Sequence, residues 1–321
     1  MSTAATWTVM SILNWSANYL KEKGVDDART VVEWLLCDTL SCSRMDLYLK
    51  FDRPLNDREL GVFKPMLLKC AAKQPVQQVV GSCEFYGLKL ALDDTVLIPR
   101  PETERLVEEA IRLAGDVRKA RQTAAPQTAP AAETDADAEI PAFVPPAEIR
   151  ILDIGSGSGC IAVALAMHIP EARVVALERS GDALKVLERN IHFYNLEKRV
   201  EIVHCDIREY RPAEPFDMIV SNPPYIAGRE MASLETNVSY YEPRMALSDE
   251  GDGLSFYRLF AEKFPEWLKE EGSALLEFGG PAQTPALTEI FSAYERRIVR
   301  DYQQDDRVLV LRNKQAAAKE T

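Results

Sequence analysis

Residues 149–160 read IRILDIGSGSGC, and this stretch decides the fold. Its first six residues are mostly branched and apolar, which predicts a strand buried on both faces. Gly155, Gly157 and Gly159 follow at alternate positions, and a helical pattern begins at Cys160. Glycines let the backbone turn tightly and let a ligand approach it closely. A strand that enters a helix through such a loop is typical of a doubly wound α/β sheet.

Outward from this stretch, apolar segments alternate with helical patterns as far as residue 312. Strands are expected at residues 149–154, 173–178, 200–205, 216–221, 273–278 and 307–312, with helices between most of them. This alternation indicates a mostly parallel sheet with helices on both faces. Because such sheets bind ligands at the carboxyl ends of their strands, functional side chains are expected there.

The first 80 residues have a different pattern, since their apolar side chains follow helical spacing. Asn56 and Glu59 form a capping-box arrangement at the start of one helix. Pro65 should kink that helix or move its start. Residues 1–80 therefore predict a small helical bundle whose apolar stripes form a core.

Residues 81–100 alternate around Gly87 and predict a β-hairpin linker to the domain at residues 101–321. A helix should open at Pro101, because proline is tolerated in a first turn. Residues 122–146 are rich in Ala, Pro, Thr and acids. That composition buries too little apolar surface to fold and predicts a flexible insertion.

The composition narrows the class of protein. A formal net charge of −12 weighs against tight, sequence-independent binding to duplex nucleic acid. Six cysteines form no CxxC pair, and the three histidines lie far from any Cys-based metal spacing, so no metal site is expected. No stretch reaches the ~18 apolar residues that a membrane-spanning helix needs. We expect a soluble cytoplasmic protein, and nothing in the sequence demands more than a monomer.

Acidic residues close three successive strands of the predicted sheet: Asp153, Glu178 and Asp206. Asp153 is placed to attract a cationic ligand group, Glu178 can accept hydrogen bonds from both hydroxyls of a ribose, and Asp206 can reach an adenine amine. Three acids and a GxGxG loop suit an adenosine ligand without phosphates. These features favour S-adenosylmethionine, whereas a glycine loop that only packs tightly is the alternative.

The strand at 216–221 ends in Asn222-Pro223-Pro224-Tyr225. Prolines fix the backbone around them, so this loop is rigid. It presents the Asn222 side-chain oxygen and a proline carbonyl, two acceptors that match both hydrogens of a planar NH2 group. Such hydrogen bonds localise the nitrogen lone pair and aim it at a sulfonium methyl group, without a strong base. Tyr225 can stack on the planar group, and an ordinary Pro-Pro turn is the alternative.

With these motifs and their flanks, the chain resembles the HemK/PrmC family. Members are protein-(glutamine-N5) methyltransferases that modify the Gly-Gly-Gln motif of class I peptide-chain release factors. The resemblance covers nearly the whole chain outside the insertion. Its further marks are Gln74-Pro75-Val76-Gln77, Phe85-Tyr86-Gly87, Leu97 to Glu104, Tyr241-Glu242-Pro243-Arg244, Ala246-Leu247, Asp252-Gly253-Leu254 and Asp306-Arg307-Val308. Asn-Pro-Pro-Tyr alone is shared with adenine-amine methyltransferases, whereas residues 98–104 and 241–244 are more selective.

The resemblance implies a Rossmann-like, class I methyltransferase domain with a mostly parallel seven-stranded sheet. It also implies an N-terminal helical domain that docks the release factor. The residues expected to contact S-adenosylmethionine are Gly155, Ser156, Gly157, Ser158, Gly159, Glu178, Asp206, Ile207 and Asn222. Those expected to hold or border the substrate amide are Asn222, Pro223, Pro224, Tyr225, Arg100 and Glu102. The chain departs from the family at Glu178, where Asp is usual, and at Ile207, where an aromatic residue is frequent.

Three other functions fit parts of the pattern. An adenine exocyclic-amine methyltransferase acting on DNA or RNA would use the same loop, but it predicts a basic face that the charge does not show. A dinucleotide-dependent oxidoreductase predicts GxGxxG spacing and a hydride-handling residue beside the loop. A catalytically idle S-adenosylmethionine-binding module is disfavoured by the intact Asn-Pro-Pro-Tyr.

Several polar residues have two interpretations. Glu242, Arg244 and Asp252 either bind the substrate backbone or pair with one another on the surface. Glu277 and Gly279 either border the cofactor pocket or serve packing. The histidines are expected at the surface or in packing contacts rather than as bases: His168, His192 and His204.

Overall fold

A computed structural model describes residues 7–124 and 148–314, which form two compact units. The first unit holds the chain up to Glu84 together with Lys89–Ile98 and Glu230–Arg244. The second holds Phe85–Leu88, Pro99–Arg229 and the chain from Met245 onward. From residue 125 to 146, the insertion expected from the sequence lies outside the described residues.

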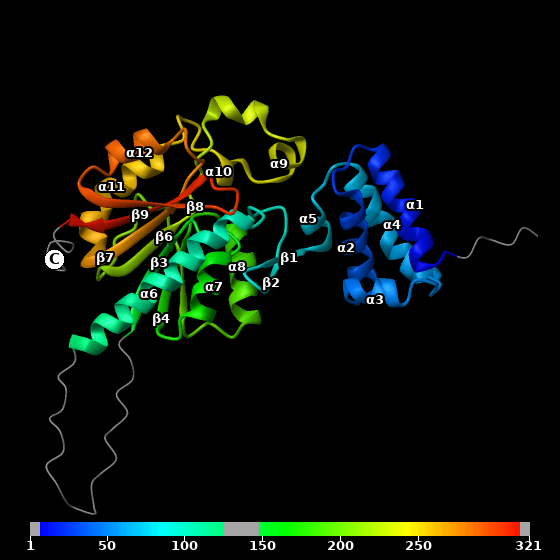
Figure 1. Cartoon of the computed structure of the whole chain (residues 1–321), viewed down its shortest axis with the longest axis horizontal. Coiled ribbons are helices and arrows are strands. Elements are labelled where there is room, and N and C mark those ends of the chain that lie inside the picture. The colour runs from blue at the N-terminus through cyan, green and yellow to red at the C-terminus, as the bar shows by residue number, and fades with distance from the viewer. Residues whose placement is uncertain (1–6, 125–147, 315–321) are drawn as a thin grey trace, which may run out of the picture. The chain divides into compact units, whose positions relative to one another are not determined.

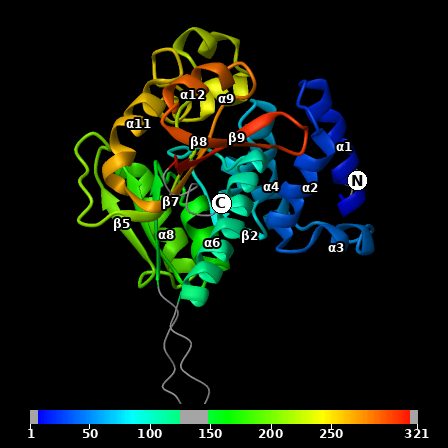
Figure 2. The ribbon, with the colours of Figure 1, turned by 60° about the vertical axis from the view of Figure 1, so that its left-hand side comes forward.

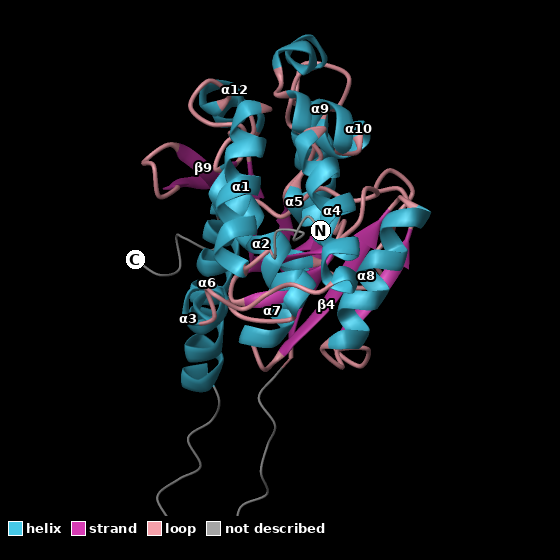
Figure 3. Cartoon of the chain, turned by 90° about the vertical axis from the view of Figure 1, so that its right-hand side faces the viewer, coloured by secondary structure: helices cyan, strands magenta, loops and turns pink. Residues whose placement is uncertain are grey.

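The first unit is a helical bundle, in which α1, α2 and α4 lie side by side (Figure 3). Its helices are α1 (Val9–Glu22), α2 (Ala28–Leu40), α3 (Arg44–Leu49), α4 (Asp57–Ala71) and α5 (Val76–Val80). Their apolar faces share one core, which includes Leu13, Val32 and Phe63. The predicted capping box is present, because the Asn56 side chain accepts from the Glu59 amide at 2.9 Å. Helix α4 starts at this cap and continues through Pro65.

A segment from later in the chain packs with this bundle. It contains α9 (Thr236–Tyr241), which follows the 3-10 helix η2 (Gly228–Ser233). The Tyr241 hydroxyl donates to the Ala72 carbonyl at 2.7 Å, and the buried Gln78 side chain donates to the Tyr241 carbonyl at 2.8 Å. Residues 230–244 therefore group with the first unit, although the sequence interpretation counts them within the domain at 101–321.

The linker and the next helix follow the expected order. A two-stranded hairpin is formed by β1 (Ser82–Phe85) and β2 (Leu88–Ala91). After it come the 3-10 helix η1 (Pro101–Thr103) and the long helix α6 (Glu104–Ala124). The Glu104 carboxylate accepts from the Tyr86 amide at 2.8 Å, which fixes the hairpin turn to the start of α6.

The second unit is a seven-stranded sheet in the order β5-β4-β3-β6-β7-β9-β8 (Figure 1). The first five of these strands are parallel to one another, whereas β9 is antiparallel to both β7 and β8. The strands are β3 (Ile149–Ile154), β4 (Ala172–Glu178), β5 (Val200–His204), β6 (Phe216–Ser221), β7 (Leu268–Glu277), β8 (Tyr294–Arg300) and β9 (Asp306–Asn313). The mostly parallel, doubly wound sheet is confirmed.

Helices cover both faces of this sheet (Figures 1 and 2). One face carries α6, α7 (Cys160–His168) and α8 (Gly181–Phe193). The other packs against α11 (Ser255–Trp267) and α12 (Thr284–Ile290), whose buried Phe260, Trp267 and Leu287 join sheet residues in one apolar cluster. The short helix α10 (Arg244–Leu247) lies in the loop before α11. The central strands are buried on both sides, which explains their uninterrupted apolar sequence.

The residue pattern had not indicated β8. Its sequence, YERRIVR, lacks apolar alternation because it is an edge strand with only Tyr294 and Val299 buried. Charged side chains are tolerated on such an edge and protect it from pairing with other chains. No helix within the described ranges 7–124 and 148–314 is long and apolar enough to cross a membrane.

Candidate active site

The glycine loop and the Asn222 loop meet at one edge of the sheet. Strands β3 and β6 are parallel neighbours, and their last residues, Ile154 and Ser221, are register partners. The buried Ser221 hydroxyl donates to the Ile154 carbonyl at 2.8 Å and ties the two strand ends together. Gly155 and Asn222 are the next residues of each strand. The topology therefore brings both predicted motifs to the same place, as expected for the carboxyl edge of a doubly wound sheet.

The glycines of the loop serve two different purposes. A Cβ at Gly159, where φ is +80°, would overlap the Leu187 side chain of α8, so this glycine permits close packing of α7 and α8. At Gly155, by contrast, a Cβ would meet no protein heavy atom within 4 Å. Tight packing alone accounts for Gly159 but not for the open space beside Gly155. That space suits a ligand lying against the backbone.

Glu178 holds the glycine loop to the end of β4. One carboxylate oxygen accepts from the Gly157 amide at 2.9 Å and the other from the Ser180 amide at 2.7 Å. The side chain is 8% exposed. A carboxylate offers about four acceptor positions, so about two stay available, the number that a ribose diol requires.

Asp206 has strong partners within the chain. Its carboxylate accepts from the Arg208 guanidinium at 2.9 and 2.6 Å, and from Arg179 at 3.4 Å. The Arg208 hydrogen bond lowers the pKa of Asp206 well below its usual value. A contact with an adenine amine must therefore compete with Arg208, which the sequence did not indicate. The neighbouring Ile207 is 8% exposed and belongs to the apolar cluster that the sheet shares with α11 and α12.

Asp153 is fully buried at the end of β3, beneath the loop. Neither carboxylate oxygen makes a hydrogen bond of normal geometry, although Ser156 and the Ala162 amide lie close enough to favour the charged form. Burial raises the pKa of Asp153 to about 7, and the nearby Glu178 adds to this rise. Asp153 therefore puts a buried carboxylate two residues before the exposed Gly155, and such a carboxylate favours a cationic group nearby.

This burial makes stability depend on pH. Since the folded-state pKa of Asp153 lies above its ordinary value of 3.8, the folded state binds more protons between pH 4 and pH 7, and stability is lost as pH rises through that window. Relative to wild type, Asp153→Asn should gain on the order of 3 kcal/mol of unfolding free energy between pH 5 and pH 8. Urea unfolding at both pH values measures this.

The exposed Asp182 provides the control, because its pKa is lowered by Lys185 rather than raised. Asp182→Asn should show no such gain at pH 8. A difference between wild type and Asp153→Asn that is the same at both pH values would contradict the prediction.

Asn222 is held by the segment that precedes α6. Its side-chain nitrogen donates to the Thr103 hydroxyl at 3.2 Å, and Thr103 is 1% exposed in η1. The charges of Arg100 and Glu102 act on both Tyr225 and Glu277. Arg100 and Glu102 therefore lie near Tyr225, the last residue of the Asn222-Pro223-Pro224-Tyr225 segment. Their expected place beside the substrate amide stays a prediction.

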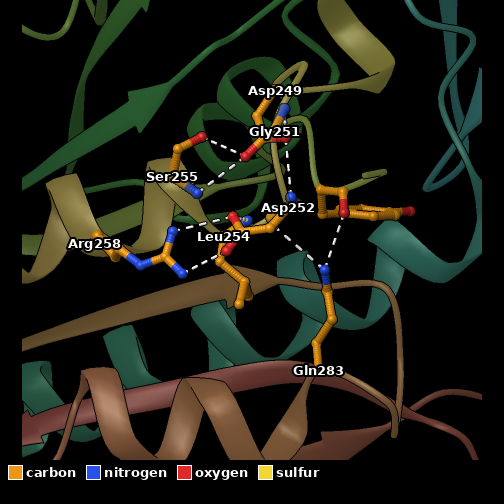
Figure 4. Close-up of polar contacts among 9 residues, drawn as sticks. Asp249, Gly251, Asp252, Leu254, Ser255, Arg258 and Gln283 are labelled. Atoms are coloured by element: carbon orange, nitrogen blue, oxygen red, sulfur yellow. Dashed lines mark hydrogen bonds and ion pairs between the residues drawn. The ribbon is translucent and has the colours of Figure 1, made fainter. Parts of the chain in front are cut away.

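The Gln283 side chain ties together three loops, which contain Tyr225, Gly253 and Gly279. The Gln283 amide nitrogen donates to the Tyr225 carbonyl at 3.0 Å and to the Gly253 carbonyl at 3.3 Å, while its oxygen accepts from the Gly279 amide at 2.8 Å. Asp249 accepts from the amides of Gly251, Gly253 and Ser255 at 2.8–3.0 Å, which closes the loop before α11 (Figure 4). Burial raises the pKa of Tyr225, so its hydroxyl stays protonated.

Several polar residues that had two interpretations in the sequence make contacts within the protein. Asp252 forms an ion pair with Arg258 at 2.5 Å (Figure 4), and the buried Glu242 accepts from the Ile98 amide at 3.1 Å within the first unit. The histidines make packing or surface contacts, with the Ala164 carbonyl, Glu197 and the Arg179 carbonyl as partners of His168, His192 and His204.

Sequence reasoning missed three residues that organise the site: Thr103, Asp249 and Gln283. Each acts through a hydrogen bond to a residue distant in sequence or to loop backbone, so no spacing rule points to it. Thr103 was visible only as a member of the segment from Ile98 to Glu104. Gln283 lies in a loop with no motif of its own.

Comparison with known proteins agrees with this geometry. Residues 11–81 match the PrmC N-terminal domain, and residues 138–252 match the methyltransferase small domain. The chain is 39% identical over 279 residues to the release factor glutamine methyltransferase of Geobacter sulfurreducens, covering 87% of each chain. The chain belongs to the release factor glutamine methyltransferase family. The family resemblance inferred from the motifs is confirmed.

Other members of the release factor glutamine methyltransferase family are similarly close. The proteins from Chlorobaculum tepidum and Bacillus subtilis are 35% and 31% identical to this chain. Each alignment covers 94% of this chain and 96% of the relative. Among solved structures, the hMettl16 catalytic domain in complex with a MAT2A 3′UTR hairpin aligns with a TM-score of 0.50 at 16% identity. That alignment covers 78% of this chain and 81% of the other, and it shows the shared fold.

The chain uses S-adenosylmethionine as its cofactor. The residues at the strand ends fit that group: open space beside Gly155, spare acceptor positions on Glu178 and the buried carboxylate of Asp153. S-adenosylmethionine when bound supplies an electrophilic methyl group on a cationic sulfur.

Proposed function

We propose that this protein methylates the side-chain nitrogen (N5) of the glutamine in the Gly-Gly-Gln motif of class I peptide-chain release factors. The observation that carries the proposal is the register of β3 and β6, which sets the glycine loop beside the Asn222 loop. Because the two loops follow register partners on neighbouring strands, they can hold a methyl donor and a planar amide next to one another. The names of the relatives supply the carrier of that amide, a release factor.

The chain's own residues perform three tasks in this proposal. The Asn222 oxygen and the Pro223 carbonyl accept the two amide hydrogens and so orient the nitrogen lone pair. Tyr225, neutral because burial raises its pKa, presents a ring on which the planar amide stacks. Pro224 keeps the backbone rigid, and Arg100 and Glu102 border the site.

Cofactor binding is assigned to the loop and the acids around it. Ser156 and Ser158 lie between the glycines, and the Ser158 carbonyl is fixed by the buried Asn190 side chain at 2.8 Å. The Glu178 carboxylate accepts hydrogen bonds from the ribose hydroxyls, and Ile207 packs against the adenine. Asp206 contacts the adenine amine only where it can share its carboxylate with Arg208.

Glu178→Gln should raise the dissociation constant for S-adenosylmethionine about 10–100-fold, because hydrogen bonds to a charged acceptor are worth about 1.5–3 kcal/mol. Isothermal titration calorimetry measures the constant. Glu178→Asp keeps the charge and should bind within a few-fold of wild type. Unchanged affinity in Glu178→Gln would mean that this carboxylate only clamps the loop.

Radiolabelled S-adenosylmethionine tests the substrate directly. The protein is incubated separately with a purified class I release factor, with its Gly-Gly-Ala variant and with duplex DNA or RNA. We expect label on the release factor alone, with the added methyl group mapped to the glutamine by peptide mass spectrometry. Label on nucleic acid would support the adenine-amine alternative, and equal label on the Gly-Gly-Ala variant would exclude glutamine as the acceptor.

The proposal also covers the setting of the reaction. The helical unit docks the release factor, and the protein acts as a cytoplasmic monomer without stable binding to nucleic acid. A net charge of −12 supports the last point. Light scattering after size-exclusion chromatography checks the monomer, and a dimer at micromolar concentration would contradict it.

A further inference from the structure

A row of polar side chains leads from Asn222 through Thr103 to Glu277, and the last two are buried. The Asn222 side-chain nitrogen, Nδ2, donates to the Thr103 hydroxyl oxygen at 3.2 Å. The Thr103 hydroxyl also lies near the Glu277 carboxylate at the end of β7, where it favours the charged form of that carboxylate. Both Thr103 and Glu277 are 1% exposed, so water does not replace these partners.

The direction of hydrogen bonding along this row follows from the chemistry of its far end. A carboxylate accepts hydrogen bonds and donates none, so the Thr103 hydrogen points toward Glu277. The Thr103 oxygen is then an acceptor for Asn222, and the group it binds must be the amide nitrogen rather than the amide oxygen. The acceptor at one end thus fixes the orientation of the amide at the other.

This orientation matters because the oxygen and nitrogen of an amide have nearly the same shape. Packing alone cannot choose between the two orientations, whereas hydrogen bonding can. With Nδ2 turned toward Thr103, Oδ1 is free to accept from a substrate NH2 group. With the amide reversed, Nδ2 would face the substrate NH2 group, which is also a donor, and Oδ1 would face the Thr103 oxygen, which is also an acceptor.

We infer that Thr103 and Glu277 are positioning residues that hold the Asn222 amide with its oxygen toward the substrate amide. The inference rests on the proposed function, since it concerns the group that binds the glutamine. Neither residue contacts the substrate, so each acts through Asn222. Glu277 is itself held in place, because its backbone carbonyl accepts from the buried Tyr257 hydroxyl at 2.7 Å.

The arrangement works in both charge states of Glu277. Burial raises the pKa of Glu277 to about 7, Thr103 and the charge of Arg307 lower it, and Glu102 and Arg100 act in opposite directions. Tyr225 and Tyr257 also face it. The second carboxylate oxygen, Oε2, is buried without a partner. A proton on that oxygen would leave the other oxygen able to accept a hydrogen bond from Thr103.

Three variants test the inference, with labelled transfer to the release factor as the assay. Thr103→Val keeps the side-chain shape but removes the hydroxyl, so kcat should fall about 10–100-fold through loss of alignment. Thr103→Ser keeps the hydroxyl and should recover most of the rate. Glu277→Gln adds a donor that can reverse the hydrogen bonding along the row, so its kcat should also fall about tenfold or more.

Matched controls are available on α12, where Thr288 and Glu289 are exposed. The Thr288 hydroxyl donates only to a helix carbonyl at 2.8 Å, so Thr288→Val and Glu289→Gln should retain wild-type rates. Affinity for S-adenosylmethionine and the melting temperature are measured for every variant. We expect the affinity to stay within about twofold of wild type while kcat falls, which a general folding defect would not produce.

Two results would overturn the inference: wild-type kcat in Thr103→Val, or a loss in Thr103→Ser as large as in Thr103→Val, which would assign Thr103 to packing. Failure of the proposed function is distinguishable, because in that case the wild-type protein itself transfers no label to the release factor.

Discussion

Replacing Asn222 with alanine is expected to lower kcat for glutamine methylation by at least about 10²–10³-fold. The substitution removes one of the two acceptors that orient the amide nitrogen, and the lone pair stays delocalised into the carbonyl. The flanking prolines keep the backbone in place, so the loop itself should not collapse. Labelled transfer to a release factor under saturating cofactor measures kcat.

Cofactor binding separates this role from a structural one. Asn222→Ala should bind S-adenosylmethionine within a few-fold of wild type, since Glu178 and the glycine loop lie on other strands. Loss of cofactor binding together with loss of rate would mean that Asn222 mainly serves the cofactor. The stability of the variant, measured by thermal unfolding, should change little because the side chain is only partly buried.

Replacing Gly253 with alanine should have the second largest effect on kcat and should also lower stability, although this residue touches no reacting atom. Gly253 has φ of +80°, and its Cβ would overlap the Tyr225 carbonyl oxygen and come within 3.0 Å of the Gln283 amide nitrogen. Backbone must therefore move. We expect Gly253→Ala to lose about 2–4 kcal/mol of unfolding free energy. Because the Asn222 loop, which ends at Tyr225, would shift, kcat should also fall about a hundredfold.

Gly251→Ala is a close control in the same loop. A Cβ there would lie 3.5 Å or more from the Asp249 side chain, which is ordinary van der Waals contact. This variant should be near wild type in both stability and rate. If Gly253→Ala kept wild-type kcat, the Tyr225 backbone would tolerate displacement and the loop would not need its rigidity.

The sequence by itself determined the architecture and the positions of the glycine loop and the Asn222 loop. Central strands are buried on both faces, so their apolar runs are uninterrupted and easily recognised. The glycine loop and Asn222-Pro223-Pro224-Tyr225 are contiguous, and their backbone conformation depends mostly on their own residue types. Edge strand β8 was missed for the opposite reason, since an exposed strand carries no apolar alternation.

Tertiary structure alone decided which groups meet those loops. Thr103, Asp249 and Gln283 come from η1 and from two loops of the second unit, and they act through hydrogen bonds over up to 119 residues of sequence. A hydrogen bond depends on distance and angle in space, and residue type predicts neither. Residue type also did not predict the hydrogen bond from Arg208 to the Asp206 carboxylate. The sequence had indicated adenine as the partner of that carboxylate. Likewise, residues 230–244 group with the helical unit because Tyr241 finds its partners there.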